Sequence, residues 1–189
     1  MPNQYKNECD VLVIGGGMAG LYAANSASMK NKNLKVMLLT ASELGSGGCS
    51  KRTHGINAAI NEGDSIDLHI QDTLTGGGYL NNKNLVTALC TDIIDRMKQL
   101  ENWKLELDKT HDDKYDVGTY GGSTMSRSLH NRDMTGLQIV QILTQQAIIN
   151  GVFVKEHCWV LQLLHQDNHC YGVLVLNRET KQAEIYYAK

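Results

Sequence analysis

A run of glycines near the start of the chain has the spacing of a dinucleotide-binding turn. Gly15, Gly17 and Gly20 satisfy the pattern G-x-G-x-x-G, directly after an apolar segment and before a segment with helical periodicity. Gly15 permits a tight turn, Gly17 lets the backbone approach a pyrophosphate, and Gly20 lets helix and strand pack closely. The N-terminus of the helix then offers N–H groups and a positive dipole to phosphate. A glycine-rich turn without a ligand is the alternative, and the context favours nucleotide binding.

The type of nucleotide does not follow from this motif. An acidic residue is expected at the tip of the second strand, about twenty residues on, where it would bind the ribose hydroxyls. Thr40-Ala41-Ser42 stands there instead. Glu43 lies slightly further along and could reach the ribose, although a solvated loop carboxylate is the favoured interpretation. The motif alone therefore does not separate NAD from FAD.

The elements around the motif predict a β-α-β unit. Cys9–Ile14 and Leu34–Leu39 read as buried parallel strands, and Met18–Lys30 reads as the helix between them. Val152–Val154 is expected to be a third parallel strand. Further helices are predicted over residues 65–75, 82–100 and 133–150, the last with Asp133 as N-cap and Gly151 as C-terminal cap.

Three short apolar runs near the end of the sequence predict an antiparallel meander. They cover residues 159–164, 171–176 and 183–187, and turn residues such as Asp167-Asn168 separate them. Together with the parallel strands, this pattern predicts an α/β, Rossmann-like fold with one parallel sheet and one antiparallel β-meander. One domain is the simplest organisation for 189 residues.

Composition excludes several classes of protein. The formal net charge of −2, without a run of lysines and arginines, argues against nucleic-acid binding. The apolar runs are strand-sized, so neither a transmembrane segment nor a signal peptide is expected, and the chain reads as soluble and cytoplasmic. Five cysteines without a C-x-x-C pair argue against a disulfide framework and against a metal or iron–sulfur site.

Four later segments carry a family resemblance. They are Gly55-Ile56-Asn57-Ala58-Ala59, then His69-x-x-Asp72-Thr73 with Gly76-Gly77, then Gly121-Gly122 with Arg127 and Asp133-x-Thr135-Gly136, and finally the meander from Cys158 through Gly172 to Leu176. In this order and spacing they resemble the flavoprotein of succinate dehydrogenase and fumarate reductase, a family that includes L-aspartate oxidase. The resemblance covers nearly the whole chain.

The resemblance implies that residues 1–189 are the N-terminal part of an FAD-binding domain, incomplete at its C-terminus, with the capping and C-terminal domains absent. It also implies a set of positions along the cofactor, from the pyrophosphate through the adenosine to the flavin. The implied cofactor-binding residues are Gly15, Gly16, Gly17, Met18, Ala19, Gly20, Thr40, Ala41, Ser42, Gly47, Gly48, Cys49, Lys51, His54, Gly55, Ile56, Cys158, Trp159 and Val160.

Two positions depart from the family pattern. Gly48 stands where members with covalently bound flavin carry histidine, so non-covalent FAD is expected, which in the family favours fumarate reduction or aspartate oxidation over succinate oxidation. His54 replaces the first glycine of a G-G pair. Its side chain could hydrogen-bond the flavin, or it could be an exposed loop histidine; in either case it puts the loop geometry in question.

The other polar residues have structural and functional readings side by side. His69, Asp72 and Thr73 fit the end and cap of a helix better than a catalytic role. Arg127 and Asp133 could form an ion pair that orients the flavin loop, and a solvated arginine with a capping aspartate explains them nearly as well. Lys51-Arg52 reads as solvated, and Cys49 is the thiol worth testing for reactivity.

The expected function follows from the resemblance. The whole enzyme would pass a hydride between flavin and a C4 dicarboxylate, with catalytic residues that lie outside this chain, and an electron-transfer subunit is a possible partner that could hold the protein at a membrane. An L-aspartate oxidase-type flavoprotein and a non-catalytic FAD-binding module are the alternatives. An NAD-dependent Rossmann domain is disfavoured by the missing acid after the second strand.

Overall fold

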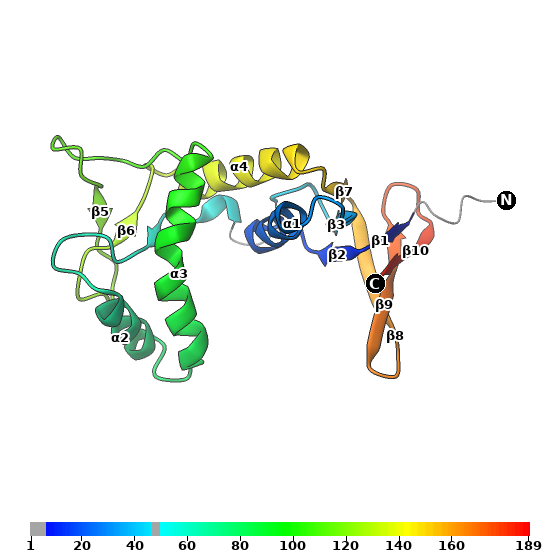
Figure 1. The fold of residues 1–189 in the computed structure, drawn as a ribbon, viewed down its shortest axis with the longest axis horizontal. Helices are drawn as coiled ribbons and strands as arrows, with labels where there is room; N and C mark the ends of the chain where they lie inside the picture. Colours follow the sequence, from blue (N-terminus) through cyan, green and yellow to red (C-terminus); the bar gives the residue numbers. More distant parts are fainter. Residues whose placement is uncertain (1–6, 47–49) are drawn as a thin grey trace. The chain divides into compact units, whose positions relative to one another are not determined.

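The computed structural model describes residues 7–46 and 50–189. Its contacts divide the chain into two compact units (Figure 1). The first unit consists of residues 1–51 and 140–189, and the second of residues 52–139.

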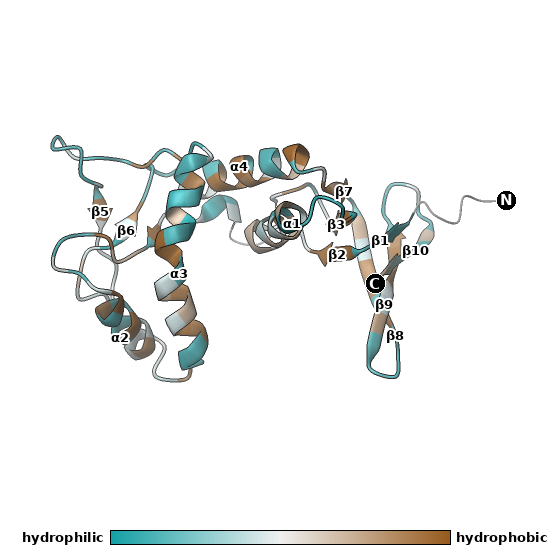
Figure 2. Ribbon diagram, in the orientation of Figure 1, coloured by the Kyte–Doolittle hydropathy of each residue, from teal (hydrophilic) through white to brown (hydrophobic). Residues whose placement is uncertain are grey.

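A parallel sheet forms the centre of the first unit. It consists of β2 (Val11–Ile14), β3 (Val36–Leu39) and β7 (Phe153–Lys155), in the order β2-β3-β7. The helix α1 (Met18–Lys30) connects β2 to β3, as predicted. All four residues of β3 are buried, and β2 and β3 take the hydrophobic colours in Figure 2. A central strand buried on both faces is apolar throughout, which explains why the sequence pattern predicts it.

The predicted first strand is divided in two. Glu8–Cys9 forms β1, which pairs in parallel with β10, whereas Val11–Ile14 pairs with β3. Asp10 lies between them, because its carboxylate Oδ2 accepts a hydrogen bond from the Lys35 backbone N–H at 2.7 Å. One polar residue thus turns the chain from one sheet into the other.

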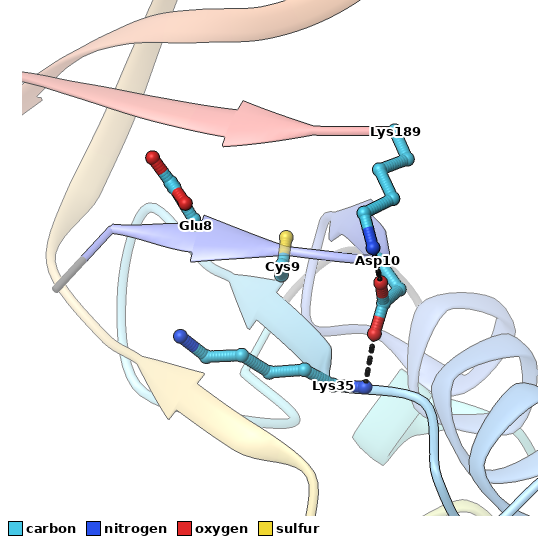
Figure 3. Close-up of a pocket in the computed structure, with 5 residues that line it drawn as sticks. All are labelled: Glu8, Cys9, Asp10, Lys35 and Lys189. Carbon is cyan, nitrogen blue, oxygen red and sulfur yellow. Dashed lines mark hydrogen bonds and ion pairs between the residues drawn. The ribbon is translucent and has the colours of Figure 1, made fainter. Parts of the chain in front are cut away.

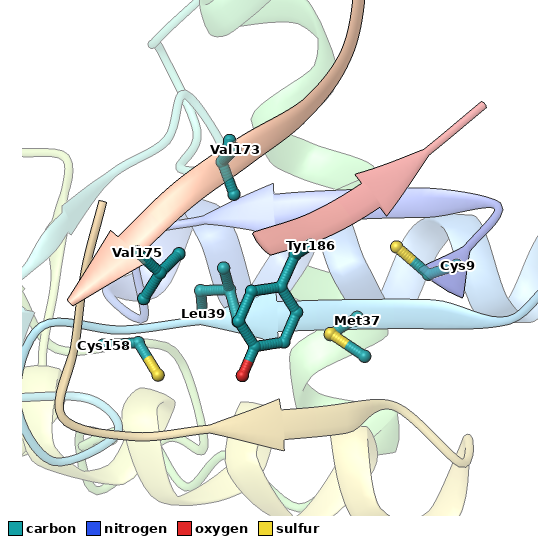
Figure 4. Close-up of a cluster of buried hydrophobic side chains, with 7 residues drawn as sticks. All are labelled: Cys9, Met37, Leu39, Cys158, Val173, Val175 and Tyr186. Carbon is teal, nitrogen blue, oxygen red and sulfur yellow. The ribbon is translucent and has the colours of Figure 1, made fainter. Parts of the chain in front are cut away.

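The predicted meander is confirmed. The strands β8 (Cys158–Gln166), β9 (His169–Asn177) and β10 (Ala183–Ala188) pair antiparallel, and the sheet order is β1-β10-β9-β8. Asp167 and Asn168 form the first turn with φ of 48° and 63°, the left-handed values that a tight hairpin requires. Figure 4 shows the buried cluster in which the meander meets β3; it consists of Cys9, Met37, Leu39, Cys158, Val173, Val175 and Tyr186.

The helix α4 (Thr135–Ile149) packs its second half against α1 through a buried amide. Asn25 is fully buried, and its Nδ2 donates to the carbonyl oxygens of Leu21 and Leu143 at 3.0 and 2.9 Å. Asn150 Nδ2 donates to Asn25 Oδ1 at 3.0 Å, which completes the set. Gly151, with φ of 72°, ends the helix as predicted.

The second unit combines two helices with a small sheet. The helices are α2 (Ile66–Gly76) and α3 (Lys83–Asn102), with the expected polar N-caps Ser65 and Asn82. The sheet consists of β4 (Ile56–Asn57), β6 (Ser128–Leu129) and β5 (Val117–Gly118), in the order β4-β6-β5. A short 3-10 turn, η1 (Ser50–Arg52), precedes β4 in the chain.

Over the part of the chain that the structure describes, none of the helices combines the length and the apolar character needed to cross a membrane.

Candidate cofactor-binding site

The glycine turn after β2 is held by close backbone packing. Gly15 donates its N–H to the Leu39 carbonyl at 2.8 Å and has φ of 108°, a value that favours glycine. A Cβ on Gly16 would lie 2.8 Å from Thr40 Cβ, and a Cβ on Gly20 would collide with the Gly15 carbonyl oxygen. The turn, the strand and the first turn of α1 therefore touch at distances that only glycine allows.

The N-terminus of α1 fits a diphosphate. Its N-cap residue, Gly17, has no side chain that could cover the first N–H groups, and the first helical turn contains no acidic residue. The first N–H groups of a helix lack intrahelical acceptors and carry a partial positive charge. Ser50 Oγ accepts a hydrogen bond from the Met18 N–H at 3.1 Å and is buried. Sequence reasoning missed Ser50, although its place in the Gly/Ser-rich loop was a signal.

The residues after β3 differ in what they offer a ligand. Thr40 is buried, because its N–H donates to the Lys155 carbonyl at 2.9 Å and its carbonyl accepts from the Cys158 N–H at 2.8 Å. Ala41 and Ser42 are exposed. These two residues, rather than Thr40, supply accessible atoms at the tip of the strand.

A second carboxylate lies at this edge of the sheet and was not predicted. Glu156 follows β7 directly, and its Oε1 accepts the Leu44 N–H at 2.6 Å. Glu43, the acid considered from the sequence, is exposed. The signal for Glu156 was its position just after a parallel strand, since polar groups at the carboxyl ends of such strands meet at one edge.

The start of β8 presents a strand edge. Cys158 is buried, and desolvation raises the pKa of its thiol, which keeps the group protonated. Trp159 is 45% exposed, and the Arg178 guanidinium lies 4.5 Å from the centre of its ring. Because β8 is the edge strand of its sheet, its backbone groups on one side have no strand partner there. Val160, the third predicted residue, is half-buried on the same strand.

A charged pocket in the first unit lies away from the glycine turn. It has a volume of about 280 Å³ and is lined by Glu8, Cys9, Asp10, Lys35 and Lys189 (Figure 3). Asp10 precedes β2 and Lys35 precedes β3, so the pocket is at the amino ends of the strands, whereas ligands of open α/β sheets bind at the carboxyl ends. Lys189 Nζ lies 2.6 Å from Asp10 Oδ1. We interpret this pocket as a structural tie.

In the second unit, the segment from Thr53 to Ala58 is bound along its length by backbone and hydroxyl groups. Thr135 Oγ1 donates to the His54 carbonyl at 2.8 Å, and the Gly136 N–H donates to the Thr53 carbonyl at 2.9 Å. The strand β4 then pairs with β6. In the Asp-x-Thr-Gly segment it is thus the threonine and the glycine that hold this loop.

Gly55 is required by the protein itself. A Cβ on this residue would collide with Ser128 Oγ and lie 2.8 Å from the Leu129 carbonyl oxygen. Its neighbour His54 is exposed and has an ordinary backbone conformation, since it is absent from the residues with positive φ. The loop therefore accommodates a side chain at position 54 without strain, which answers the question that the sequence raised.

Arg127 pairs with residues other than the predicted one. Its side chain is 1% exposed, and its Nε and Nη2 donate to both carboxylate oxygens of Asp64 at 2.9 Å, while Nη1 donates to Asp72 Oδ2 at 2.8 Å. Asp133 is exposed, and α4 begins only at Thr135. The proposed Arg127–Asp133 pair and the solvated arginine are both wrong, because two carboxylates enclose the guanidinium inside the unit.

Electrostatics keep this cluster charged. Burial opposes the charge of Arg127, but hydrogen bonds to Asp64 and Asp72 outweigh it and raise the pKa of the guanidinium. Burial likewise opposes the charge of Asp72, and hydrogen bonds from the backbone and hydroxyl of Thr124 lower the pKa of that carboxyl below its ordinary value. His69 lies beside them within α2, and burial followed by the charge of Arg127 lowers its pKa.

The remaining predicted residues lie in two groups. Lys51 is exposed on η1, and Ile56 is half-buried in β4. Gly47, Gly48 and Cys49 lie outside the described residues.

Comparison with known proteins places these features in a wider group. The FAD binding domain family matches residues 10–189. The flavoprotein-type relative from Methanothermobacter marburgensis, a component of its fumarate reductase (CoM/CoB), is 31% identical over 178 residues, which are 91% of this chain and 32% of that protein. The chloroplastic L-aspartate oxidase of Oryza sativa subsp. japonica is 32% identical over 186 residues, 95% of this chain and 28% of that protein. This chain spans about a third of the length of these curated relatives.

Solved structures agree with the sequence relatives. A variant of the E. coli quinol fumarate reductase flavoprotein matches with a TM-score of 0.91 and 26% identity over 96% of this chain and 31% of that chain. Sdh1 of Mycobacterium smegmatis, solved as a complex in the apo form, matches with a TM-score of 0.88 and 28% identity over 96% of this chain and 33% of that chain.

Proposed function

The chain belongs to the FAD binding domain family and is an FAD-binding domain of the fumarate reductase and succinate dehydrogenase type, and we propose that it binds FAD non-covalently for hydride transfer. This membership confirms the expected cofactor and the expected α/β fold. Bound FAD supplies a flavin that accepts or donates the hydride. The protein supplies binding and orientation.

The geometry of the glycine turn carries this proposal. Gly15 to Gly20 bring an uncovered helix N-terminus to the carboxyl end of β2, where it can receive the pyrophosphate. The accessible residues Ala41 and Ser42, and the nearby Glu156, are suited to the adenosine ribose. We assign the exposed strand edge at Trp159 and Val160 to the adenine end.

We further propose that Lys51, His54, Gly55 and Ile56, together with the Gly47–Cys49 stretch, contribute to flavin binding. The fixed backbone from Thr53 to Ala58 supports this assignment, because a rigid loop offers its N–H and carbonyl groups in constant positions. Non-covalent binding rests on Gly48, which offers no side chain for a bond to the flavin.

FAD binding can be measured directly on residues 1–189. We expect the purified chain to bind FAD, and G20A to weaken binding about 100-fold or more, since ~3 kcal/mol of backbone strain corresponds to that factor. G76A is the matched control, because Gly76 ends α2 with nothing within 4 Å of an added Cβ. Equal FAD affinity of G20A and the parent chain would remove the glycine turn from the site.

Acid precipitation tests the type of binding. We expect all flavin of the FAD-loaded chain to appear in the supernatant, whereas a covalent flavin would stay with the pellet. His54 is the nearest histidine to the expected position, and H54A should release flavin in the same way as the parent. Flavin retained in the pellet would contradict the non-covalent assignment.

We propose a C4 dicarboxylate as the substrate class of the whole enzyme, with its catalytic residues outside this chain. Support comes from the fumarate reductases among the relatives; the L-aspartate oxidases, at comparable identity, keep oxidation of an amino dicarboxylate as the second candidate. The FAD-loaded chain alone should reduce no fumarate and oxidise no aspartate. Turnover of either substrate would show that the catalytic groups lie within residues 1–189.

Partners and location are part of the same proposal. The structural relatives include a complex, which supports a partner that transfers electrons to or from the flavoprotein. We propose that the protein works in the cytoplasm, and at a membrane only through such a partner. Copurification of a tagged chain with an iron–sulfur or cytochrome protein would support this, and a monomeric flavoprotein that reacts directly with oxygen would contradict it.

A further inference from the structure

The buried cluster of Arg127, Asp64 and Asp72 lies within the second unit and has no direct access to a ligand. The arginine side chain is 1% exposed, and those of Asp64 and Asp72 are 0% and 10% exposed. Three guanidinium N–H groups are committed to the two carboxylates. Any influence of Arg127 on a cofactor must therefore pass through the residues that it holds.

On its side-chain side, Arg127 joins separate pieces of the unit. Asp64 belongs to the turn just before α2, where its Oδ1 also accepts the N–H of Ser65, the N-cap of that helix, at 2.8 Å. Asp72 lies on α2, and its Oδ2 accepts both the N–H and the hydroxyl of Thr124 at 2.9 Å. The guanidinium is thus anchored to the N-terminus and the middle of one helix.

On its backbone side, Arg127 touches the proposed flavin loop. Its carbonyl accepts the Ala58 N–H at 3.0 Å. The next two residues, Ser128 and Leu129, form β6 and pair with Asn57 and Ile56. The same residue is therefore locked to α2 by its side chain and to the Ile56–Ala58 segment by its backbone.

From this double attachment we propose that Arg127 is a positioning residue for FAD: clamped by Asp64 and Asp72, it sets the position of β6 and hence of the Gly55–Ala58 segment against the flavin. The inference rests on the proposed function of that segment. Gly55 is packed so closely on β6 that it must follow any movement of the strand. A lysine cannot replace the arginine, because the planar fork alone reaches both oxygens of Asp64 and one of Asp72 together.

The experiment measures FAD affinity, the visible circular dichroism of bound flavin and the thermal midpoint of the FAD-free chain for residues 1–189 and three variants. R127K keeps the charge and loses the fork, and D72N removes one of the three bonds. Y115F is the control: it removes the hydrogen bond from Tyr115 Oη to Glu101 Oε1, 2.7 Å long, in the same unit and away from Arg127.

We expect R127K to bind FAD about tenfold more weakly or worse, with an altered flavin dichroism, and D72N to show a smaller change of the same kind, since tenfold corresponds to about 1.4 kcal/mol. Y115F should lower the thermal midpoint without changing affinity or dichroism. If R127K does not fold, D72N and Y115F decide the question. Parent-like affinity and dichroism in R127K, or affinity losses that merely follow the thermal midpoint in all variants, would overturn the proposal. Failure of the parent chain to bind FAD would instead refute the proposed function.

Discussion

The glycine turn of the first unit and the Thr53–Ala58 loop of the second are fixed by different physical means. The glycine turn is held by steric fit: Gly16 and Gly20 leave no room for a side chain. The loop is held by partners from distant parts of the sequence, among them Thr135 and Arg127. A turn of the first kind is a local property of six residues, whereas a loop of the second kind exists only after the unit has folded.

Removing one carboxylate from the second unit should give the largest effect. In D64N the Arg127 guanidinium loses its bidentate partner inside the protein, and breaking a buried pair from one side costs about 3–5 kcal/mol. Urea unfolding of the FAD-free chain measures this loss. D113N is the matched control, because its partner Lys109 lies 2.8 Å away at the surface and such pairs contribute at most about 1 kcal/mol. Equal losses in the two variants would end the distinction between the two regions.

A steric contact should be repairable by removing volume. G16A places a Cβ 2.8 Å from Thr40 Cβ and Oγ1, and overpacking of this kind costs about 1–3 kcal/mol. The double variant G16A/T40A removes the opposing atoms and should recover about half of that loss. Urea unfolding of the two single variants and the double variant gives the coupling between the positions. Purely additive losses would show that the turn is not limited by this contact.

The loop should respond to the loss of a single hydroxyl. T135V keeps the shape of the threonine but leaves the His54 carbonyl and the Asn131 N–H without their partner, at a cost of about 1–2 kcal/mol. T135S keeps the hydroxyl and should lose less. The same unfolding measurement compares them, and a T135V that matches T135S in stability would contradict the role assigned to the hydroxyl.

The contrast also explains what the sequence could predict. Elements with local signals were predicted correctly: the helix after Gly17, the buried strand Val36–Leu39 and the hairpin at Asp167-Asn168 each depend on neighbouring residues. The strands β4, β5 and β6 have two residues each, too few for a periodic pattern.

The Arg127 cluster shows the corresponding limit for the site. Asp133 is six residues from Arg127 and was the nearest acid considered, whereas Asp64 and Asp72 are 63 and 55 residues away. Charge type alone does not select among carboxylates, because every aspartate is an equally good partner until the fold brings one close. Burial of the guanidinium was invisible for the same reason, since isolated arginines are usually solvated.

The smallest expected effect is a pH dependence that belongs to the second unit. His69 is 95% buried, since 5% of its surface is exposed, and its Nδ1 has no hydrogen-bond partner among the described residues. Arg127, Asp64 and Asp72 are the charged groups facing it, and its pKa is lowered by burial first and by Arg127 second. The folded chain therefore resists a proton that the unfolded chain accepts near pH 6.5.

The sign of the effect follows from that difference. Above pH 6.5 neither state protonates the histidine and its neutral form costs nothing, whereas below it the unfolded state gains a proton and stability falls until the pH reaches the lowered folded pKa. We expect a loss of about 1 kcal/mol or less between pH 7 and pH 5 in urea unfolding, absent in H69Q. H111Q, at an exposed histidine of the same unit, should keep the parent slope. A parent slope that survives in H69Q would show that another group, and not the histidine beside Arg127, takes up the proton.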